Sequence, residues 1–328
     1  MNTVFAILKL PYLPIHDILS FLTPFEILNF SMVSKKSKIL TKFLTRRIQS
    51  KFNVCLELQA NPYIMIYGEE YANVKYQITS EPEKNGKREY EDLFGETTET
   101  FLFYSENPVE KWMKLFEHIK GVLNVNVIGV DFQMDLFENR RIIDWMEFQF
   151  QSCLGSTITG ENVSHSDINY FLENLRVTES VFLESNSTET VSLKVPKNLL
   201  ELKIQNGYWI RLHDFLNFDA KEIQIFSNSL TVQEIGSFLK SWMDLGSHLN
   251  TKIIQVQITD QFVLDSILQE VPHMARRLPD TMRSGCYTVT VHGGATITRV
   301  DGAEAMVCAF QEFDDWKLSV TFLRNLQG

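Results

Sequence analysis

The residue types that carry catalysis and metal binding are present in this chain, but their spacing matches none of the common motifs. The seven histidines, at positions 16, 118, 165, 213, 248, 273 and 292, include no pair at i, i+3 or i, i+4 that would place two imidazoles on one helix face for a metal ion. No nucleophile elbow (G-x-S-x-G), phosphate loop (G-x-x-x-x-G-K-[ST] or G-x-G-x-x-G) or H-E-x-x-H motif occurs. We therefore expect a non-enzymatic protein with no cofactor and no metal.

Three local arrangements have both a chemical and a structural interpretation. His213-Asp214 supplies two members of a Ser-His-Asp triad, although a surface dipeptide is the simpler interpretation. Cys55 lies within a strand pattern, which favours a core side chain over a nucleophile. Asp314-Asp315 stands next to a turn, where acids are common. A hydrolase or transferase site assembled from distant residues is the remaining catalytic alternative, and a cleft with convergent polar groups would reveal it.

Basic residues gather near the start of the chain. Between Lys35 and Lys51 there are five Lys and two Arg with no acid, and residues 1–52 carry a formal charge of +6. Because the whole chain carries −10, the other 276 residues carry −16. A solvated helix face is the simpler interpretation of the basic stretch, and a docking face for an acidic partner is the alternative. No aromatic residues are interleaved for base stacking, so we expect no nucleic acid partner.

Length and composition indicate an ordinary globular protein. With 328 residues, 44% hydrophobic and 22% charged, the chain is long enough for one large domain or two modest ones. Four cysteines without a C-x-x-C pair favour a reducing, intracellular compartment, either cytoplasmic or nuclear. No apolar run approaches the roughly 20 residues that span a bilayer, and Lys9 and Pro11 interrupt the apolar start before a signal peptide is complete. We expect no membrane partner.

Apolar spacing predicts three short helices in the first fifty residues. The first carries its apolar stripe at Ile15, Ile18, Leu19 and Leu22. Thr23-Pro24-Phe25-Glu26 is typical of a capping box and begins the second helix. Ser34 can cap a third, whose apolar side is Ile39, Leu40, Phe43, Leu44 and Ile48. Three such helices bury too little apolar surface to be stable alone, so we expect them to lean on a partner or on the rest of the chain.

This stretch resembles an F-box. The resemblance is carried in order by Leu10-Pro11, Ile18-Leu19-Ser20-Phe21-Leu22-Thr23-Pro24, Ile27-Leu28 and Ser31-Met32-Val33-Ser34-Lys35-Lys36. Ser37 departs from the Trp that many F-boxes have there, which weakens one packing contact. The resemblance implies docking onto the Skp-family linker subunit, and through it a cullin, of an SCF-type ubiquitin ligase. By position, the resemblance implies that the linker-binding residues are Leu10, Pro11, Ile18, Leu19, Leu22, Leu28 and Val33. The alternative role of each is an ordinary place in the core of the helices.

After Phe52 the apolar period changes to two, which predicts a small antiparallel sheet with strands at 54–58, 63–67 and 73–78. Residues 81–99 hold seven acids against three bases, with Pro82 and an Asn85-Gly86 pair, and predict an exposed loop. A helix at 108–122 and an apolar strand at 123–132 follow.

Strand-like pairs then recur at equal spacing. Val181/Leu183, Leu202/Ile204 and Ile223/Ile225 lie 21 residues apart, and a fourth pair, Val256/Ile258, follows after 33. Helices are expected between strands at 167–172 and 234–239. Residues 199–206 echo the strand turn of a leucine-rich repeat with the Asn one place early. Stacked units of this kind give a mostly parallel sheet, with chance alignment as the alternative.

The C-terminal part predicts an antiparallel β meander. Strands at 287–291 and 296–300 flank Gly293-Gly294, and Asp301-Gly302 precedes a strand at 304–310; both pairs suit tight hairpin turns. Trp316, Leu318, Val320 and Phe322 alternate with polar residues, as in a strand with one buried face.

A second resemblance covers this half of the chain. Residues 230–244, the strand at 253–258 and residues 297–305 resemble the second common type of F-box associated domain, found in the large nematode F-box families. That resemblance implies a domain that recruits the protein to be ubiquitinated. The family has no universal ligand residues, so no substrate contact is implied for this sequence.

Together these features predict a mixed α+β and α/β protein with two modules. Residues 1–52 form a small helical F-box module, and residues 53–328 form a leucine-rich-repeat-like recognition domain. We divide the latter into a small sheet at 53–105, strand and helix repeats at about 108–272 and a meander at 286–323. The predicted function is a substrate-recognition adaptor of an SCF ubiquitin ligase, with an unidentified protein substrate. The alternative is a non-catalytic binding scaffold whose first helices only cap the repeats.

Overall fold

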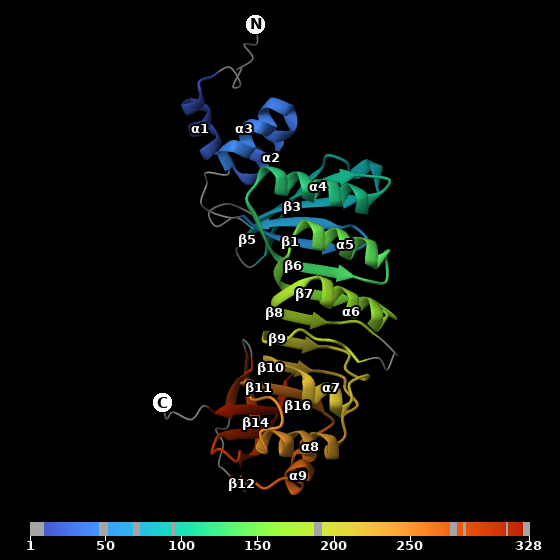
Figure 1. The fold of residues 1–328 in the computed structure, drawn as a ribbon, viewed down its shortest axis with the longest axis vertical. Coiled ribbons are helices and arrows are strands. Elements are labelled where there is room, and N and C mark those ends of the chain that lie inside the picture. Colours follow the sequence, from blue (N-terminus) through green and yellow to red (C-terminus); the bar gives the residue numbers. More distant parts are fainter. Residues whose placement is uncertain are drawn as a thin grey trace. The chain divides into compact units, whose positions relative to one another are not determined.

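The computed structural model describes residues 10–45, 52–67, 73–93, 96–186, 192–275, 281–284, 287–312 and 314–323 (Figure 1). The chain divides into two compact units, Met1–Leu136 and Phe137–Gly328.

The first unit joins three helices to a mixed sheet. The helices are α1 (Tyr12–Ser20), α2 (Pro24–Val33) and α3 (Lys35–Thr45). The strands are β1 (Phe52–Leu58), β2 (Tyr63–Tyr67), β3 (Asn73–Thr79), β4 (Arg88–Leu93), β5 (Glu96–Tyr104) and β6 (Val125–Gln133), arranged in the order β6-β1-β2-β3-β5-β4. β1, β2 and β3 pair antiparallel as predicted, while β6 and β5 add to β1 and β3 in parallel. The helix α4 (Pro108–Val122) connects β5 to β6, and such a parallel crossover needs a helix of this kind.

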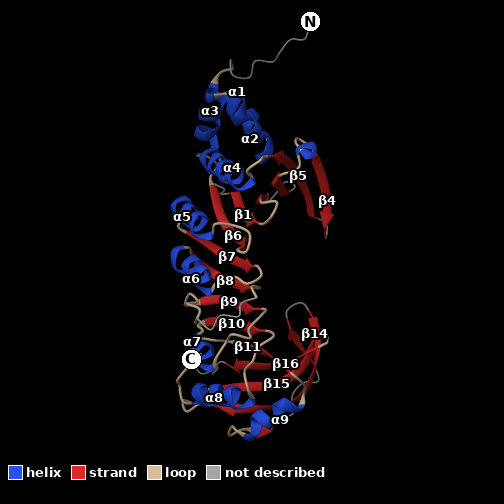
Figure 2. Cartoon of the chain, turned by 90° about the vertical axis from the view of Figure 1, so that its right-hand side faces the viewer, coloured by secondary structure: helices blue, strands red, loops and turns tan. Residues whose placement is uncertain are grey.

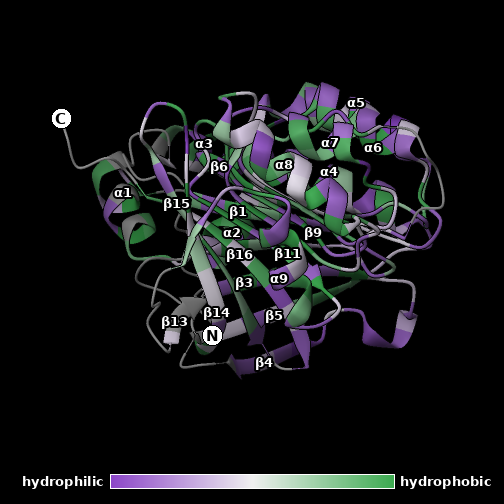
Figure 3. Cartoon of the chain, turned by 90° about the horizontal axis from the view of Figure 1, so that it is seen from below, coloured by the Kyte–Doolittle hydropathy of each residue, from purple (hydrophilic) through white to green (hydrophobic). Residues whose placement is uncertain are grey.

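The predicted loop at 81–99 is wrong. A short 3₁₀ turn (Pro82–Lys84) leads into β4, which pairs antiparallel with β5 at the edge of the sheet. The side chains of residues 88–92 are exposed, so their charge does not conflict with strand formation, and Figure 3 shows β4 in the colours of hydrophilic residues. Charged side chains on an edge strand also oppose pairing with other chains. The many acidic residues of this segment therefore indicate that its side chains are exposed to solvent. They do not indicate that its backbone lacks strand pairing.

The second unit begins with parallel strands and helices in alternation. Its elements are α5 (Asn139–Gln149), β7 (Ser152–Thr159), α6 (His165–Asn174), β8 (Arg176–Leu183), β9 (Leu199–Ile204), α7 (Leu212–Asn217), β10 (Ala220–Ile225), α8 (Val232–Met243) and β11 (Ile253–Ile258). The pairs β7–β8, β8–β9, β9–β10 and β10–β11 are all parallel. Figure 2 shows α5, α6, α7 and α8 in succession along one side of these strands.

The 21-residue spacing corresponds to the strand register. Val181 lies opposite Leu202, and Leu202 lies opposite Ile223, so each apolar pair repeats one strand further along. The next partner of Ile223 is Ile254, and that of Ile225 is Val256. The predicted fourth pair, Val256/Ile258, does lie in a strand and is buried, but the residues in register with Ile223 and Ile225 are two positions earlier in β11. The crossover from β10 to β11 through α8 is longer than the preceding crossovers, so the 21-residue spacing does not continue to β11.

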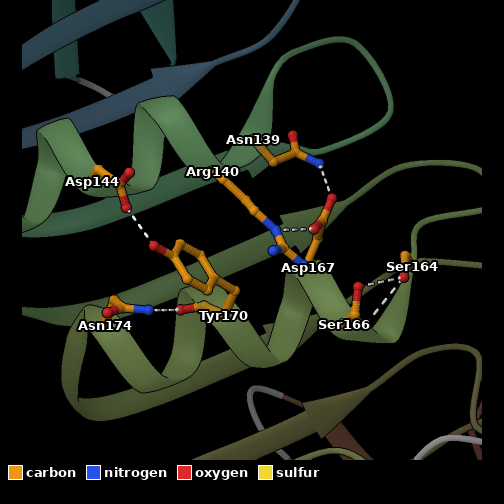
Figure 4. Close-up of polar contacts among 8 residues, drawn as sticks. All are labelled: Asn139, Arg140, Asp144, Ser164, Ser166, Asp167, Tyr170 and Asn174. Atoms are coloured by element: carbon orange, nitrogen blue, oxygen red, sulfur yellow. Dashed lines mark hydrogen bonds and ion pairs between the residues drawn. The ribbon is translucent and has the colours of Figure 1, made fainter.

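Polar contacts join α5 and α6 (Figure 4). Asp167 accepts hydrogen bonds from Asn139 Nδ2 at 2.9 Å and from Arg140 Nε at 3.3 Å. The hydroxyl of Tyr170 donates to Asp144 Oδ1 at 2.6 Å, and this bond raises the pKa of the tyrosine. Most of the other buried side chains of these helices are apolar, among them Ile142, Met146, Ile168 and Phe171.

After β11 come α9 (Phe262–Gln269), β12 (Met274–Ala275), β13 (Thr281–Ser284), β14 (Tyr287–Thr298), β15 (Glu304–Glu312) and β16 (Asp315–Leu323). The order β12-β14-β15-β16 continues to β11, with antiparallel pairing at every step. The predicted turn at Asp301-Gly302 is confirmed, and Gly302 takes a φ of 86° there.

The predicted hairpin at Gly293-Gly294 is wrong, because β14 runs through both glycines as one strand. The register with β15 shifts between His292 and Gly294, so that Gly293 is an extra residue with a φ of 72°. A β-bulge of this kind needs a residue that tolerates positive φ. The two glycines therefore mark a bulge and not a chain reversal.

The expectation of one buried face on β16 is also wrong in its middle part. Lys317 and Ser319 are buried together with Leu318 and Val320. Lys317 forms an ion pair with Glu312, and its ammonium lies 4.3 Å from the centre of the Phe226 ring. β16 lies between β15 and β11, so neither long edge is open, and a lysine on the second face is tolerated because it has both a carboxylate and an aromatic partner.

Candidate docking surface on the N-terminal helices

Side-chain caps define the start of α2 and α3. Thr23 N–H donates to Glu26 Oε2 at 2.9 Å, and Glu26 N–H donates to Thr23 Oγ1 at 3.3 Å, so the predicted capping box is confirmed. Ser34 caps α3 as predicted, by accepting from Ser37 N–H at 3.1 Å. Ser37 Oγ accepts from Ser34 N–H at 2.9 Å in return. The serine that stands in place of the usual Trp is thus fully buried and completes the cap.

Replacing Thr23 by alanine is expected to lower the free energy for opening α2 by about 1 kcal/mol, because the N-terminal amides lose their hydroxyl acceptor. Native-state hydrogen exchange of the Glu26, Ile27 and Leu28 amides in the full chain measures this. Thr23→Ser keeps the hydroxyl and is the control. Unchanged exchange rates in Thr23→Ala would show that the cap does not limit opening of the helix.

The seven residues implied for linker binding lie in three kinds of environment. Leu19 and Leu28 are buried, and Leu19 forms a small core with Ile15. Leu10 and Leu22 are half-buried and pack against that core, and Ile18 is also half-buried. Pro11 and Val33 are exposed, with Val33 at 73%. Only the exposed and half-buried members are accessible to a partner before any rearrangement.

Further exposed apolar side chains lie on the same helices. They include one residue of α1, the residue after it and residues of α2 and α3, namely Leu13, Phe21, Met32, Ile39 and Phe43. Ile39 and Phe43, which belong to the predicted apolar side of α3, face solvent, whereas Leu40 of that side packs against the core of Ile15 and Leu19. Ile48 lies outside the described residues. Soluble proteins rarely expose many large apolar groups in a short stretch unless a partner covers them. Four lysines of α3, at 35, 36, 38 and 42, are exposed as well.

The fully buried side chains described for α3 carry hydroxyl groups. Ser37, Thr41 and Thr45 recur every four residues and are all buried. Thr41 Oγ1 donates to the Ser37 carbonyl at 2.8 Å, and Thr45 Oγ1 donates to the carbonyl of Val122 in α4. The four-residue period of these small polar residues indicates the buried side of α3 in the sequence. The spacing of the apolar residues alone does not indicate it.

Two more contacts fix α2 against the same unit. Ser31 Oγ lies 2.8 Å from His118 Nε2 on α4, and the pKa of His118 is lowered by burial and by the nearby charge of Lys38. The ring of Phe25 stacks on Phe101 of β5 with 3.6 Å between centroids. Specific side chains therefore hold α2 and α3, while Leu13, Phe21, Met32 and Ile39 are exposed to solvent.

Two of the arrangements weighed as catalytic, His213-Asp214 and Cys55, have structural roles. The buried Asp214 accepts hydrogen bonds from the Arg211 N–H at 3.1 Å at the start of α7 and from Ser192 Oγ. Nε2 of the exposed His213 lies 3.1 Å from Asp214 Oδ1. The carboxylate thus lies between the serine and the histidine, so the histidine does not contact the hydroxyl as a general base would. Burial raises the pKa of Cys55 to about 11, which disfavours the thiolate that a nucleophile needs. Among the described residues, no group of acids, histidines and cysteines could hold a metal ion.

Within the described ranges, no helix is both long and apolar enough to cross a membrane.

Comparison with protein families gives two matches. Residues 7–48, which include α1, α2 and α3, match the F-box domain, and residues 190–256 match the F-box associated domain FBA_2. The second match contains β9, α7, β10 and α8 and reaches into β11. No curated protein and no solved structure is similar enough to count as a match.

Proposed function

We propose that this protein, an F-box protein with a C-terminal F-box associated domain, is the substrate-recognition adaptor of an SCF-type ubiquitin ligase. In this proposal residues 1–52 bind a Skp-family linker, and through it a cullin. Residues 53–328 bind a target protein. The observation that carries the proposal is the set of exposed apolar side chains on helices that match an F-box.

The adaptor acts by proximity in this proposal. It holds a lysine-bearing target near a ubiquitin-charged conjugating enzyme and supplies no acid, base or nucleophile of its own. Raising the effective concentration of the target then accounts for its contribution to the reaction. The parallel strands of residues 176–258, with helices between most of them, support a leucine-rich-repeat-like recognition domain. Ubiquitin ligases of this class act inside cells, so we propose an intracellular, cytoplasmic or nuclear, location.

The test is retention of a purified Skp-family linker by the tagged full chain. Wild type is expected to retain the linker. Val33→Asp is expected to weaken binding at least tenfold, about 1.4 kcal/mol, because a carboxylate would be buried without a partner. The double variant Leu10→Ala and Pro11→Ala should also weaken retention.

The matched control is Phe148→Asp, which places the same charge on an exposed apolar position of α5, where the side chain is 84% exposed. It should bind the linker like wild type. The adaptor proposal is wrong if wild type retains no linker, or if the N-terminal variants bind as well as Phe148→Asp.

One observation favours the alternative of a binding scaffold capped by its first helices. Ser31 and Thr45 contact α4, and Phe25 stacks on Phe101, as expected for a cap. Urea unfolding of a truncated chain that contains only residues 53–328 distinguishes the two functions. If the N-terminal helices are a docking module, the truncated chain should still unfold cooperatively. If they are a cap, cooperative unfolding should be lost.

A further inference from the structure

A cavity of about 530 Å³ lies inside the second unit, at the carboxyl ends of β10 and β11 and beside the start of α8. Residues from distant parts of the chain line it. Ile235 comes from α8, Ile258 ends β11, Tyr208 follows β9, and Asp314, Asp315 and Trp316 stand at the start of β16. Ligands of α/β sheets commonly bind beyond the carboxyl ends of the strands, and this volume is typical of a binding site.

The lining combines apolar, aromatic and acidic groups. Ile235 and Ile258 are buried, Trp316 is half-buried, and Tyr208 is 62% exposed. Asp314 and Asp315 are exposed. The described residues that line the cavity include no Lys, Arg or His. The cavity therefore presents negative charge beside aromatic rings and an aliphatic surface.

Hydrogen bonds hold the neutral polar groups of the lining in place. Asn228 Nδ2 donates to the Gln257 carbonyl at 2.9 Å, and Asn228 Oδ1 accepts from Leu230 N–H at 3.0 Å. Gln257 Nε2 donates to Asp315 Oδ1 at 2.8 Å, which orients that carboxylate. No described residue donates a hydrogen bond to the carboxylate of Asp314. The ring of Trp316 already makes an edge contact with His292, with 4.9 Å between centroids. The capacity left for a ligand is thus the Asp314 carboxylate, the open lone pairs of Asp315, the ring of Tyr208 and the part of the Trp316 ring that His292 does not cover.

We propose that this cavity binds an arginine side chain in an extended segment of the target protein, an inference that rests on the proposed adaptor function. The aliphatic stem of arginine suits contact with Ile235 and Ile258, as long cationic side chains bury their stems and keep their heads polar. Its guanidinium can donate to two carboxylates at once and stack on Tyr208 or Trp316. Lysine offers a point charge without the planar fork, so it fits less well.

The test uses a random heptapeptide phage library, selected on the tagged full chain. We expect enrichment of peptides that contain arginine. The strongest synthetic peptide should bind Asp314→Asn at least tenfold more weakly than wild type, because the substitution removes charge and keeps shape. Tyr208→Ala should weaken binding several-fold, and replacing the peptide's arginine by neutral citrulline should weaken it as much as Asp314→Asn does.

Asp244→Asn is the control, since Asp244 is an exposed acid of the same unit outside the cavity, and it should bind the peptide like wild type. Equal binding to Asp314→Asn, no arginine enrichment, or equal enrichment of lysine would each overturn the proposal. Linker retention is measured on the same preparations. Retained linker without arginine peptides means that only this inference fails. Peptide binding that depends on Asp314 without retained linker means instead that the adaptor function fails.

Discussion

Trp112→Ala is expected to lower the free energy of unfolding of the first unit by about 3–5 kcal/mol, the usual cost of removing a large buried aromatic side chain. Trp112 is fully buried on α4 with Phe116 and Ile119. Its Nε1–H donates to the Tyr63 carbonyl at 2.9 Å, which ties α4 to β2. The substitution therefore leaves a cavity and also removes a hydrogen-bond donor from a strand carbonyl.

Urea unfolding followed by circular dichroism, together with hydrogen exchange of the α4 amides, measures this loss. Trp112→Phe fills most of the space without the donor and should lose about 1–2 kcal/mol. Phe148→Ala, at an exposed position of α5, should change stability by less than about 0.5 kcal/mol. If Trp112→Ala unfolded like Phe148→Ala, the packing of α4 would not depend on this side chain.

The second large effect is a loss of stability in acid through His248. This imidazole is buried in the second unit, with ring centroids 5.0 Å from Phe238 and 5.4 Å from Phe215. Burial lowers its pKa from 6.5 to about 4. The unfolded chain therefore takes up a proton at a higher pH than the folded chain. Stability falls as the pH drops below 6.5 and stops falling from this source near pH 4, with a total loss of about 3 kcal/mol.

His248→Asn separates this effect from the titration of carboxylates. Asparagine does not titrate and tolerates the φ of 54° at this position. The difference in unfolding free energy between wild type and variant, measured by urea titration from pH 7 to pH 4, should shift steadily against wild type. A difference that stays constant with pH would show that His248 is not the group responsible.

Local signals in the sequence predicted a large part of the fold. The Thr23 capping box, the helix at 108–122 and the period-two strands at 54–58 and 63–67 all form as expected. The cap depends on residues three apart, and the helix and the strands each show their own apolar period within one short segment, so the sequence shows each of these signals directly. The equal spacing of Val181, Leu202 and Ile223 succeeded for a related reason, since equal crossovers keep the register constant.

The errors arise where distant residues decide the outcome. The pair Gly293-Gly294 fits a turn by composition, yet β15 pairs with residues on both sides of it and makes it a bulge. Strand β7 has Ser, Gly and Thr at five of its eight positions, so apolar alternation gave no signal for it. Lys317 is buried because Glu312 and Phe226 both lie beside it.

The candidate sites divide in the same way. The helices that match an F-box follow one another in sequence, so their order was recognisable, but which apolar side chains face solvent depends on α4 and the sheet. The cavity lined by Tyr208, Ile235, Ile258 and Asp314 was not predicted, because its parts come from four elements more than 100 residues apart from first to last. Asp314-Asp315 was interpreted only as turn chemistry.

The hydroxyl-lined side of α3 has a consequence for how the N-terminal helices separate from α4. The Ser31–His118 bond joins α2 to α4, and the Thr45–Val122 bond joins α3 to α4. Because hydrogen bonds are directional, neither helix can slide by one turn along α4 without breaking its own bond. Yet hydroxyl groups exchange protein partners for water at a net cost of only about 1 kcal/mol each, unlike aliphatic groups. These hydrogen bonds therefore fix the position of the N-terminal helices relative to α4, but they contribute little to the free energy that keeps the helices and α4 together. When the N-terminal helices separate from α4, these residues expose polar hydroxyl groups to water. They do not expose an apolar surface that would promote aggregation.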